Sequence, residues 1–249
     1  MRRPLIAGNW KMNMSARQAE DFVCEIKKVA DSTSNEVLVC VPSIHLGLLS
    51  SKVLGSDLEI GAQNMHEEEK GAFTGEISAE MLKDYDISHC IIGHSERRKF
   101  FNERDESVNL KLKKALQKDI SAVVCVGETL EEKEGGKAEA VIKRQILGAF
   151  KDIPGHDAAI VAIAYEPVWA IGTGKTAEAR DAQKTIAYIR GLLNDKYGKE
   201  ISEKTRILYG GSVKSSNIKD IMKQKDIDGV LVGGASLDKD HFKKIIEYK

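Results

Sequence analysis

The chain has 249 residues, of which 42% are hydrophobic and 31% are charged, as in globular proteins that bury a full core. Lys plus Arg and Asp plus Glu number 38 each, so the formal net charge is zero, which gives no overall attraction for nucleic acid or for an anionic membrane. No apolar run approaches the roughly 20 residues that a membrane-spanning helix needs. An anionic ligand would therefore need a local attraction, from a lysine, a helix N-terminus or backbone amides.

Short apolar runs alternate with amphipathic segments along the whole chain. Eight runs predict β-strands: Leu5–Trp10, Val37–Val41, Leu58–Gln63, His89–Ile92, Ala122–Val126, Ala159–Tyr165, Arg206–Tyr209 and Gly229–Val232. Several are continuous rather than alternating, which is typical of parallel strands covered on both faces. Helical periodicity is clearest in residues 15–30, 105–118 and 176–197. Ser15 with Gln18 predicts a capping box at the first of these helices, and Gly198 predicts the end of the last one.

This alternation indicates the fold class. Parallel strands need crossover connections, and eight strand–helix units in about 250 residues predict an α/β protein with one closed (β/α)₈ barrel. A doubly wound open sheet is the alternative. No linker rich in Pro, Gly or Ser divides the chain, so we predict a single domain over residues 1–249. Reactive groups on such a barrel are expected where strands end and the following loops begin.

The sixth predicted strand ends in a carboxylate, Glu166. Pro167 disfavours a helical conformation for the residue before it, so the strand stays extended up to Glu166. The loop that follows contains Gly172 and Gly174 and could close over the carboxylate. This setting suits a base that removes a proton from carbon. Taken alone, such a residue is more often an ordinary surface glutamate.

The first predicted strand runs into Asn9 and Lys11. Lys11 could bind a phosphate-bearing substrate and offset developing negative charge, and a Schiff base is also chemically possible. Asn9 could orient the lysine or donate to a substrate oxygen. Taken alone, Lys11 would more often be a solvated lysine, and Asn9 would more often be a turn residue.

The fourth predicted strand leads to His94 at the start of a short helix. The positive end of a helix disfavours imidazolium, so we predict a neutral ring that donates a proton to a substrate oxygen and takes it back. Ser95 and Glu96 are expected to support the site, Glu96 through the helix start or an ion pair with a lysine. A single histidine is otherwise more often structural.

Glycine-rich turns follow the seventh and eighth predicted strands. Ser212, Gly233 and Gly234 could present backbone amides to a phosphate, at the place where barrels often bind this group. Gly172 would complete this cradle when its loop closes. Ordinary turn chemistry is the alternative for Ser212, Gly233 and Gly234.

Other chemistry has weaker support. Gly174-Lys175-Thr176 lacks the first glycine of a P-loop, and the glycines near 172 lie too far past the strand for a dinucleotide fingerprint. We predict no metal site, because His66 lacks a second histidine at zincin spacing and Cys90 with His94 offers only two ligands. The four cysteines show no zinc or redox spacing and favour a reducing compartment. With no signal-peptide core at the start, we expect a cytoplasmic protein.

Several long motifs resemble the triosephosphate isomerase family from the first strand to the last helix: Gly8–Asn13, Ile91–Arg98, Ala164–Lys175, Tyr209–Val213 and Gly233–Ala235. The resemblance implies a TIM barrel that interconverts dihydroxyacetone phosphate and D-glyceraldehyde 3-phosphate without a cofactor, in glycolysis and gluconeogenesis. It implies that Glu166 is the base, that His94 is the electrophile, and that Lys11 and Asn9 bind substrate. The triosephosphate isomerase family is itself a standard example of a carboxylate base paired with a neutral histidine and of a lid that closes over the substrate.

The resemblance also assigns the phosphate site, a lid and a partner. Phosphate-binding amides would come from Gly172, Ser212, Gly233 and Gly234. The lid would comprise Pro167, Val168, Trp169, Ala170, Ile171, Gly172, Thr173, Gly174 and Lys175. The family is typically a homodimer, whose interdigitating loop would carry Phe73, Thr74 and Gly75. Glu67 replaces a residue that is often aromatic in this loop, and Lys214-Ser215-Ser216 replaces a commoner form with proline.

Two alternatives stay open at this point. One is another phosphate-binding barrel enzyme, such as an aldolase that uses Lys11 as a Schiff base. The other is a non-catalytic barrel that only binds or scaffolds, which would not need Lys11, His94 and Glu166 together. The expected partners are a triose phosphate and a second copy of the chain, with no nucleic acid and no membrane.

Overall fold

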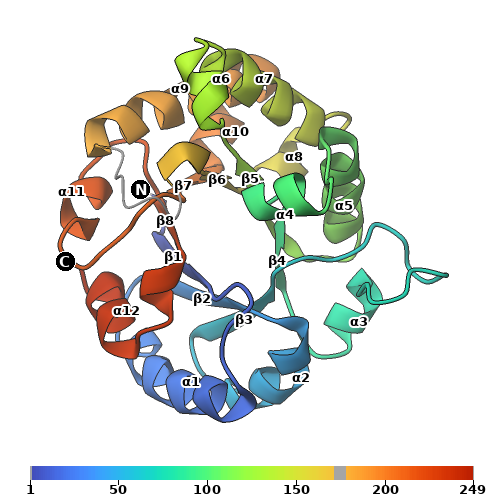
Figure 1. Cartoon of the computed structure of the whole chain (residues 1–249), viewed down its shortest axis with the longest axis vertical. Coiled ribbons are helices and arrows are strands. Elements are labelled where there is room, and N and C mark those ends of the chain that lie inside the picture. Colours follow the sequence, from blue (N-terminus) through green and yellow to red (C-terminus); the bar gives the residue numbers. More distant parts are fainter. Residues whose placement is uncertain (1, 171–177, 249) are drawn as a thin grey trace.

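The strands form a closed ring. The structure is a computed structural model that describes residues 2–170 and 178–248. The strands are parallel, pair in chain order, and close through pairing of β1 with β8. Figure 1 shows the strands inside an outer layer of helices. The strands are β1 Leu5–Asn9, β2 Glu36–Val41, β3 Leu58–Ala62, β4 His89–Ile92, β5 Ser121–Val126, β6 Ala162–Tyr165, β7 Arg206–Tyr209 and β8 Gly229–Val232.

Each strand leads into one or more helices. The helices are α1 Ala16–Ala30, α2 Ser43–Lys52, α3 Ala79–Lys83, α4 Ser95–Phe100, α5 Asp105–Gln117, α6 Leu130–Glu134, α7 Ala138–Ala149, α8 Gly155–Ala158, α9 Ala179–Tyr197, α10 Lys199–Lys204, α11 Ile218–Met222 and α12 Lys239–Ile246, with the 3₁₀ turns η1 Val168–Ala170 and η2 Gly234–Ser236. The predicted (β/α)₈ barrel is therefore confirmed, and the open-sheet alternative is wrong.

The predicted helix boundaries have visible causes. The Ser15 side chain accepts from the N–H of Gln18, and the Gln18 side chain accepts from the N–H of Ser15, so the predicted capping box is present. Gly198 has φ of 83° directly after α9, in the left-handed region that glycine enters without a steric cost.

The predicted sixth strand begins three residues too early. Ala159–Val161 is not part of β6, because the N–H of Ala159 donates to the carbonyl of Gly155 and that of Ile160 to Asp157, continuing the last turn of α8. A short apolar run looks the same in a buried helix end as in a strand, so periodicity could not separate them. Trp10 and Gln63 likewise lie one residue beyond β1 and β3.

Alternation along the strands divides the core into two layers. One cluster of buried side chains lies inside the barrel: Leu5, Ala7, Leu38, Cys40, Ile91, Val123, Cys125, Ala162, Ala164, Leu208 and Leu231. Their neighbours, such as Ile6 and Val39, point outward and pack against the helices. Because side chains alternate with a period of two, the next inward positions are Asn9, the last residue of β1, and Glu166 and Gly233, the first residues after β6 and β8.

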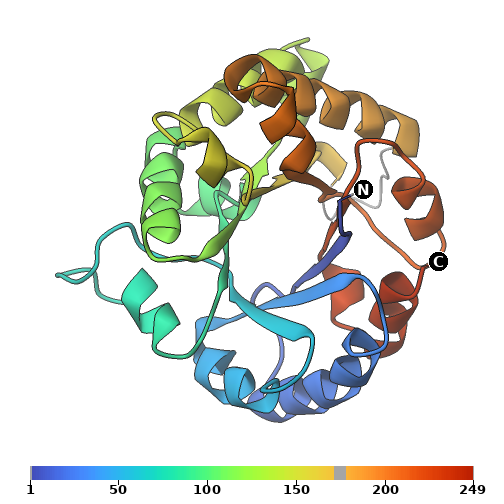
Figure 2. The same cartoon turned by 180° about the vertical axis from the view of Figure 1, so that it is seen from behind.

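The connection between β3 and α3 departs from the barrel surface. It projects away from the ring in both views, in teal beside α3 in Figure 1 and on the opposite side in Figure 2. This loop contains Phe73, Thr74 and Gly75, which are all exposed. Within residues 2–170 and 178–248, no helix combines the length and apolar character needed to cross a bilayer.

Candidate active site

The predicted catalytic and substrate-binding residues within the described part of the chain converge on one pocket at the C-terminal ends of the strands. Its volume is about 300 Å³, and its walls include Asn9, Lys11, His94, Glu166, Ser212, Gly233 and Gly234. These residues come from the ends of β1, β4, β6, β7 and β8. A lysine, a histidine and a carboxylate that are far apart in sequence thus share a space suited to a small molecule.

Glu166 is fixed at both carboxylate oxygens. Its Oε1 lies 2.9 Å from Nε2 of His94, and its Oε2 accepts from the backbone N–H of Ser95 at 2.9 Å. The side chain is buried, with 2% exposure. Burial by itself raises the pKa of Glu166, but the charge and hydrogen bond of His94 and the N–H of Ser95 together outweigh burial and lower it. The carboxylate is therefore ionised at neutral pH.

His94 is the N-cap residue of α4, as expected for a histidine at a helix start. Its Nδ1 accepts from the N–H of Glu96 at 3.2 Å, so Nε2 carries the proton that faces Glu166. Burial by itself lowers the pKa of His94, but the charge and hydrogen bond of Glu166 and the charge of Glu96 together outweigh burial and raise it. The contact at Nδ1 favours a neutral ring and Glu166 opposes one, so the predicted neutrality stays a prediction.

Lys11 lies beside this pair. Its Nζ is 2.6 Å from Oε1 of Glu96, which is the lysine ion pair expected for that glutamate. The backbone N–H of Lys11 donates to the side-chain oxygen of Asn9 at 3.0 Å, and Lys11 has φ of 53°, an uncommon conformation for a residue with a side chain. Asn9 therefore holds the backbone of Lys11 in place, and Glu96 directs its ammonium group.

The far wall of the pocket is made of small residues. Gly234 opens the turn η2 one residue past the end of β8, and a Cβ atom added to Gly234 would meet nothing within 4 Å. A Cβ on Gly233 would lie 3.7 Å from Cε of Lys11. The space before these glycines, next to a lysine and Ser212, can hold a compact anion such as a phosphate group. Gly172, predicted to complete this cradle, lies outside the described residues.

Comparison with known proteins identifies the family. A sequence model described as triosephosphate isomerase matches residues 4–249. The triosephosphate isomerase of Alkaliphilus oremlandii is 54% identical over 248 residues, covering 100% of both chains. Those of Alkaliphilus metalliredigens and Clostridium botulinum are 51% and 48% identical over 248 residues, again with 100% of each chain covered. The chain belongs to the triosephosphate isomerase family.

The lid predicted from the likeness to triosephosphate isomerases is described only up to Ala170. The N–H of Val168 donates to the carbonyl of Glu128, and Nε1 of Trp169 donates to Oε1 of Glu128 at 2.8 Å. The Nζ of Lys133 lies 3.2 Å from the centre of the Trp169 ring. The first residues after Glu166 are thus attached to the loop that follows β5. Residues 171–175 of the predicted lid lie outside the described residues.

Two buried residues near Glu166 were not predicted as part of the site. Burial raises the pKa of the Cys125 thiol well above its ordinary value, and the charge of the nearby Glu166 raises it further, so the thiol stays protonated. Glu128 is 2% exposed and also accepts from the hydroxyl of Tyr165 at 3.1 Å. The only sequence signal for Cys125 was its place on β5, where alternation from Val123 makes it an inward-facing residue. Glu128 lies in a loop, where no periodicity applies.

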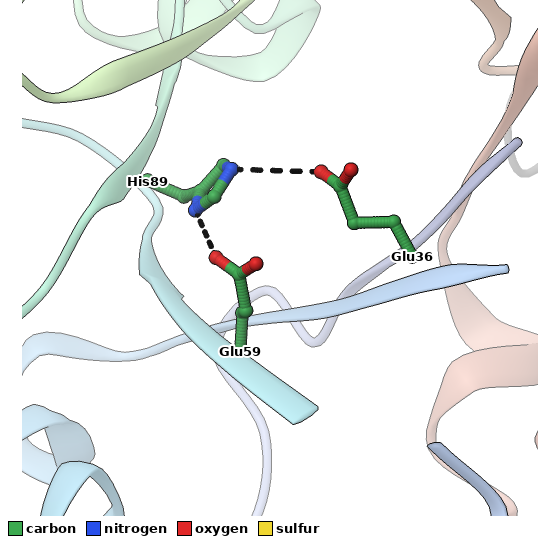
Figure 3. A group of neighbouring side chains, drawn as sticks. All are labelled: Glu36, Glu59 and His89. Atoms are coloured by element: carbon green, nitrogen blue, oxygen red, sulfur yellow. Dashed lines mark ion pairs between the residues drawn. The ribbon is translucent and has the colours of Figure 1, made fainter. Parts of the chain in front are cut away.

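A second group of ionisable side chains lies at the opposite end of the barrel (Figure 3). Glu36, Glu59 and His89 have potential ligand atoms within 4.8 Å of one another. However, Nδ1 of His89 lies 2.7 Å from Glu59 and Nε2 lies 3.8 Å from Glu36, so each nitrogen faces a different carboxylate. Arg206 is 2.6 Å from the other oxygen of Glu36. We interpret the group as an ion-pair layer of inward-facing residues at the strand starts, rather than as a metal site.

This layer predicts a pH dependence of stability. The hydrogen bond from His89 lowers the pKa of Glu59 more than burial raises it. Because the pKa is lower in the folded than in the unfolded chain, the stabilisation is complete above the unfolded pKa and is lost as pH falls through the folded one. We expect urea unfolding at a series of acidic pH values to show this loss, and Glu59→Gln to reduce it. The effect should be about 1 kcal/mol or less, since Glu59 is partly exposed. Glu134→Gln, at an exposed position, is the control, and equal pH slopes for both variants would contradict the prediction.

Proposed function

We propose that this enzyme interconverts dihydroxyacetone phosphate and D-glyceraldehyde 3-phosphate in the pocket that contains Lys11, His94 and Glu166. The reaction follows from membership of the triosephosphate isomerase family, since the family match covers residues 4–249. The observation that supports the residue assignments best is the direct contact of Glu166 with His94, 2.9 Å apart, in a pocket that Lys11 also lines. A carboxylate, an imidazole and an ammonium group thus line one small space, which supports these assignments.

The proposed roles follow from the chemistry of each group. Glu166 removes a proton from the carbon next to the carbonyl and returns it to the neighbouring carbon, so the carboxylate is regenerated. His94 gives its Nε2 proton to the carbonyl oxygen and takes a proton from the other oxygen, so the ring also ends unchanged. Lys11 stabilises the negative charge that develops on the enediolate. Because His94 and Ser95 occupy both oxygens of Glu166, substrate must replace at least the His94 contact.

Binding and shielding are assigned to the rest of the pocket. Ser212, Gly233 and Gly234 would hold the phosphate together with Lys11, and Asn9 would keep Lys11 in position. Ser95 and Glu96 would support the base and the lysine. We propose that the lid of residues 167–175 covers the enediolate and keeps water from it. No step needs a redox cofactor or a metal ion.

Proton NMR of the purified protein with dihydroxyacetone phosphate in D₂O tests the reaction directly. We expect conversion to glyceraldehyde 3-phosphate with deuterium bound to carbon, and the same rate after dialysis against a chelator. Borohydride should trap no adduct with substrate, because the proposed isomerisation forms no Schiff base with Lys11. A trapped adduct on Lys11 would instead support the aldolase alternative. Binding without conversion would support the non-catalytic one.

We further propose that the chain is a homodimer that uses the loop with Phe73, Thr74 and Gly75. Exposed apolar side chains gather around the base of this loop and along α2 and α3: Met12, Ile44, Phe73, Met81, Tyr85 and Phe101. A groove of about 420 Å³ runs beside the loop and is lined by Met12, Gln63, Phe101 and also by Lys11 and His94. The loop tip of a second copy could enter this groove, which would bring Thr74 of one subunit close to the site of the other.

A charged loop tip should prevent this association. We expect Thr74→Arg with Gly75→Glu to shift the protein toward monomer in analytical ultracentrifugation, with a marked fall in kcat, because the groove shares Lys11 and His94 with the pocket. Ile160→Arg, at an exposed apolar residue near α8, should leave both unchanged. A wild-type protein that is monomeric at micromolar concentration with full activity would contradict the proposal. Glu67, the residue of this loop that departs from the family pattern, is half-buried and is left unchanged in both variants.

Three further proposals concern the setting of the reaction. We propose that residues 1–249 act as a single catalytic domain, because the family match and the barrel both span nearly all of them. We propose a cytoplasmic location, which the free thiols of Cys24, Cys40, Cys90 and Cys125 favour. The zero formal net charge supports the absence of a nucleic-acid or membrane partner.

A further inference from the structure

The backbone around Glu166 rests on the short segment 126–128 that follows β5. The N–H of Glu166 donates to the carbonyl of Val126 at 2.8 Å, and the N–H of Val168 donates to the carbonyl of Glu128 at 3.1 Å. The Glu128 side chain accepts from Tyr165 and Trp169 on either side of the base. The segment 126–128 therefore contacts the chain before, at and after Glu166. Its position sets the position of the backbone from which the Glu166 side chain extends.

Gly127, at the centre of this segment, makes the closest contact. A Cβ atom added to Gly127 would lie 1.7 Å from the carbonyl oxygen of Glu166 and 2.7 Å from its carbonyl carbon. The two backbones are therefore packed directly against each other with no side chain between them. Any shift of Gly127 toward the pocket must move the backbone of Glu166, and any shift away would leave a gap behind it.

Gln145 holds Gly127 from behind. It lies on α7, is 5% exposed, and forms two hydrogen bonds with the same residue: the N–H of Gly127 donates to Oε1 at 2.8 Å, and Nε2 donates to the carbonyl of Gly127 at 3.1 Å. Beyond the end of β5 these backbone groups have left the strand ladder. A primary amide supplies one acceptor and one donor on the same side, so it replaces the missing strand partner at this point.

We propose that Gln145 is a positioning residue for the reaction, because it fixes Gly127 and thereby the backbone of Glu166. This inference rests on the proposed role of Glu166 as the base. Gln145 does not line the pocket and touches no reacting atom. Its effect is transmitted from α7 through Gly127 to Glu166, and it should be felt at the carboxylate, while the phosphate cradle on β7 and β8 is untouched.

The test compares Gln145→Leu with a matched control, Asn109→Leu. Asn109 is a buried amide on α5 that donates to the carbonyls of Ala149 and Lys151 at the far end of α7, away from the pocket. Both variants lose two hydrogen bonds of a buried amide and should lower Tm. We expect only Gln145→Leu to lower kcat, by about 10- to 100-fold, since a displacement near 1 Å of a catalytic group has effects of this size. The Ki of inorganic phosphate should stay within about twofold for both.

Two further variants separate positioning of the base from a general loss of packing. A carboxylic acid has the donor and acceptor of the amide when protonated, but the carboxylate repels the Gly127 carbonyl. The side chain introduced by Gln145→Glu has the same shape as glutamine, so we expect kcat near that of the wild type at acidic pH. As pH rises and the introduced group ionises, kcat should fall, which the wild type would not show. In the Glu166→Gln background, Gln145→Leu should cause little additional loss, because the group that it positions is already gone.

The outcomes separate this inference from the proposed function. If Glu166→Gln keeps wild-type turnover, the assignment of the base fails. If Glu166→Gln loses turnover while Gln145→Leu lowers only Tm, as Asn109→Leu does, Gln145 is merely structural and the inference fails alone. If Gln145→Leu does not fold, Gln145→Glu decides: a pH profile of kcat that matches the wild type would overturn the proposal.

Discussion

Replacement of Glu166 by glutamine is expected to lower kcat for triose phosphate isomerisation by about 10²- to 10⁴-fold, the range that a positioned acid–base group contributes. The amide has the same shape as the carboxylate but cannot accept a proton from carbon. Its carbonyl oxygen can still accept from the N–H of Ser95, so the local fold should persist. Deuterium incorporation followed by NMR in D₂O measures the proton-transfer step itself.

Binding of the phosphate end should survive this change. Gly233, Gly234 and Ser212 belong to the turns after β7 and β8, and none is part of the two contacts that hold the Glu166 carboxylate. We therefore expect the Ki of inorganic phosphate and the Tm to stay close to those of the wild type. Glu134→Gln, which makes the same chemical change at an exposed residue, should have no effect on kcat. Turnover of Glu166→Gln within about twofold of the wild type would assign the base to another residue.

The fold could be predicted because its signal is repeated eight times. Each unit carries an apolar run and a helical pattern, and errors at single boundaries do not change the count. The error at Ala159–Val161 shows the limit of this reasoning, because an apolar helix end and an apolar strand start differ only in hydrogen bonding. The backbone hydrogen bonds that continue the last turn of α8, not the residue types, set the start of β6.

The pocket residues could be predicted for a different reason, namely that the barrel brings all strand ends to one rim. Lys11, His94 and Glu166 follow from this rule, and of the two roles expected for Glu96, an ion pair with a lysine is present. Contacts between loops do not follow from it. Gln145 reaches Glu166 only through the backbone of Gly127, and the Glu128 side chain contacts Tyr165 and Trp169 on either side of Glu166. No periodicity in the sequence indicates such contacts.

The ion-pair layer at the other end of the barrel was missed although its positions obey the same alternation. Glu36, Glu59, His89 and Arg206 are inward positions at or next to the first residues of β2, β3, β4 and β7. In a sequence, charged residues at the start of a strand look like a solvated strand end. Only the closed ring turns them toward one another, so their mutual pairing is a property of the barrel.

Replacement of Lys11 by methionine is expected to lower kcat/KM by about 10²- to 10³-fold, the size of the loss when one preorganised group that stabilises an oxyanion is removed. Methionine keeps much of the apolar stem of lysine. It also has a Cβ atom, so the backbone strain that comes with the φ of 53° at position 11 is equal in both proteins. Glycine would relieve that strain and confuse the comparison. Because Lys11 faces both the phosphate region and the reacting end, we expect a raised KM together with a lowered kcat.

Glu96 makes a second variant necessary. In Lys11→Met the carboxylate of Glu96 loses its partner at 2.6 Å and remains beside a pocket that must accept an anion. Part of the loss would then come from repulsion rather than from the missing ammonium group. Lys11→Met combined with Glu96→Gln removes this charge and should recover part of the substrate affinity but not kcat. If the single variant binds inorganic phosphate and turns over substrate as the wild type does, the pocket does not depend on this cation, and the charge of the enediolate must be stabilised elsewhere in the site.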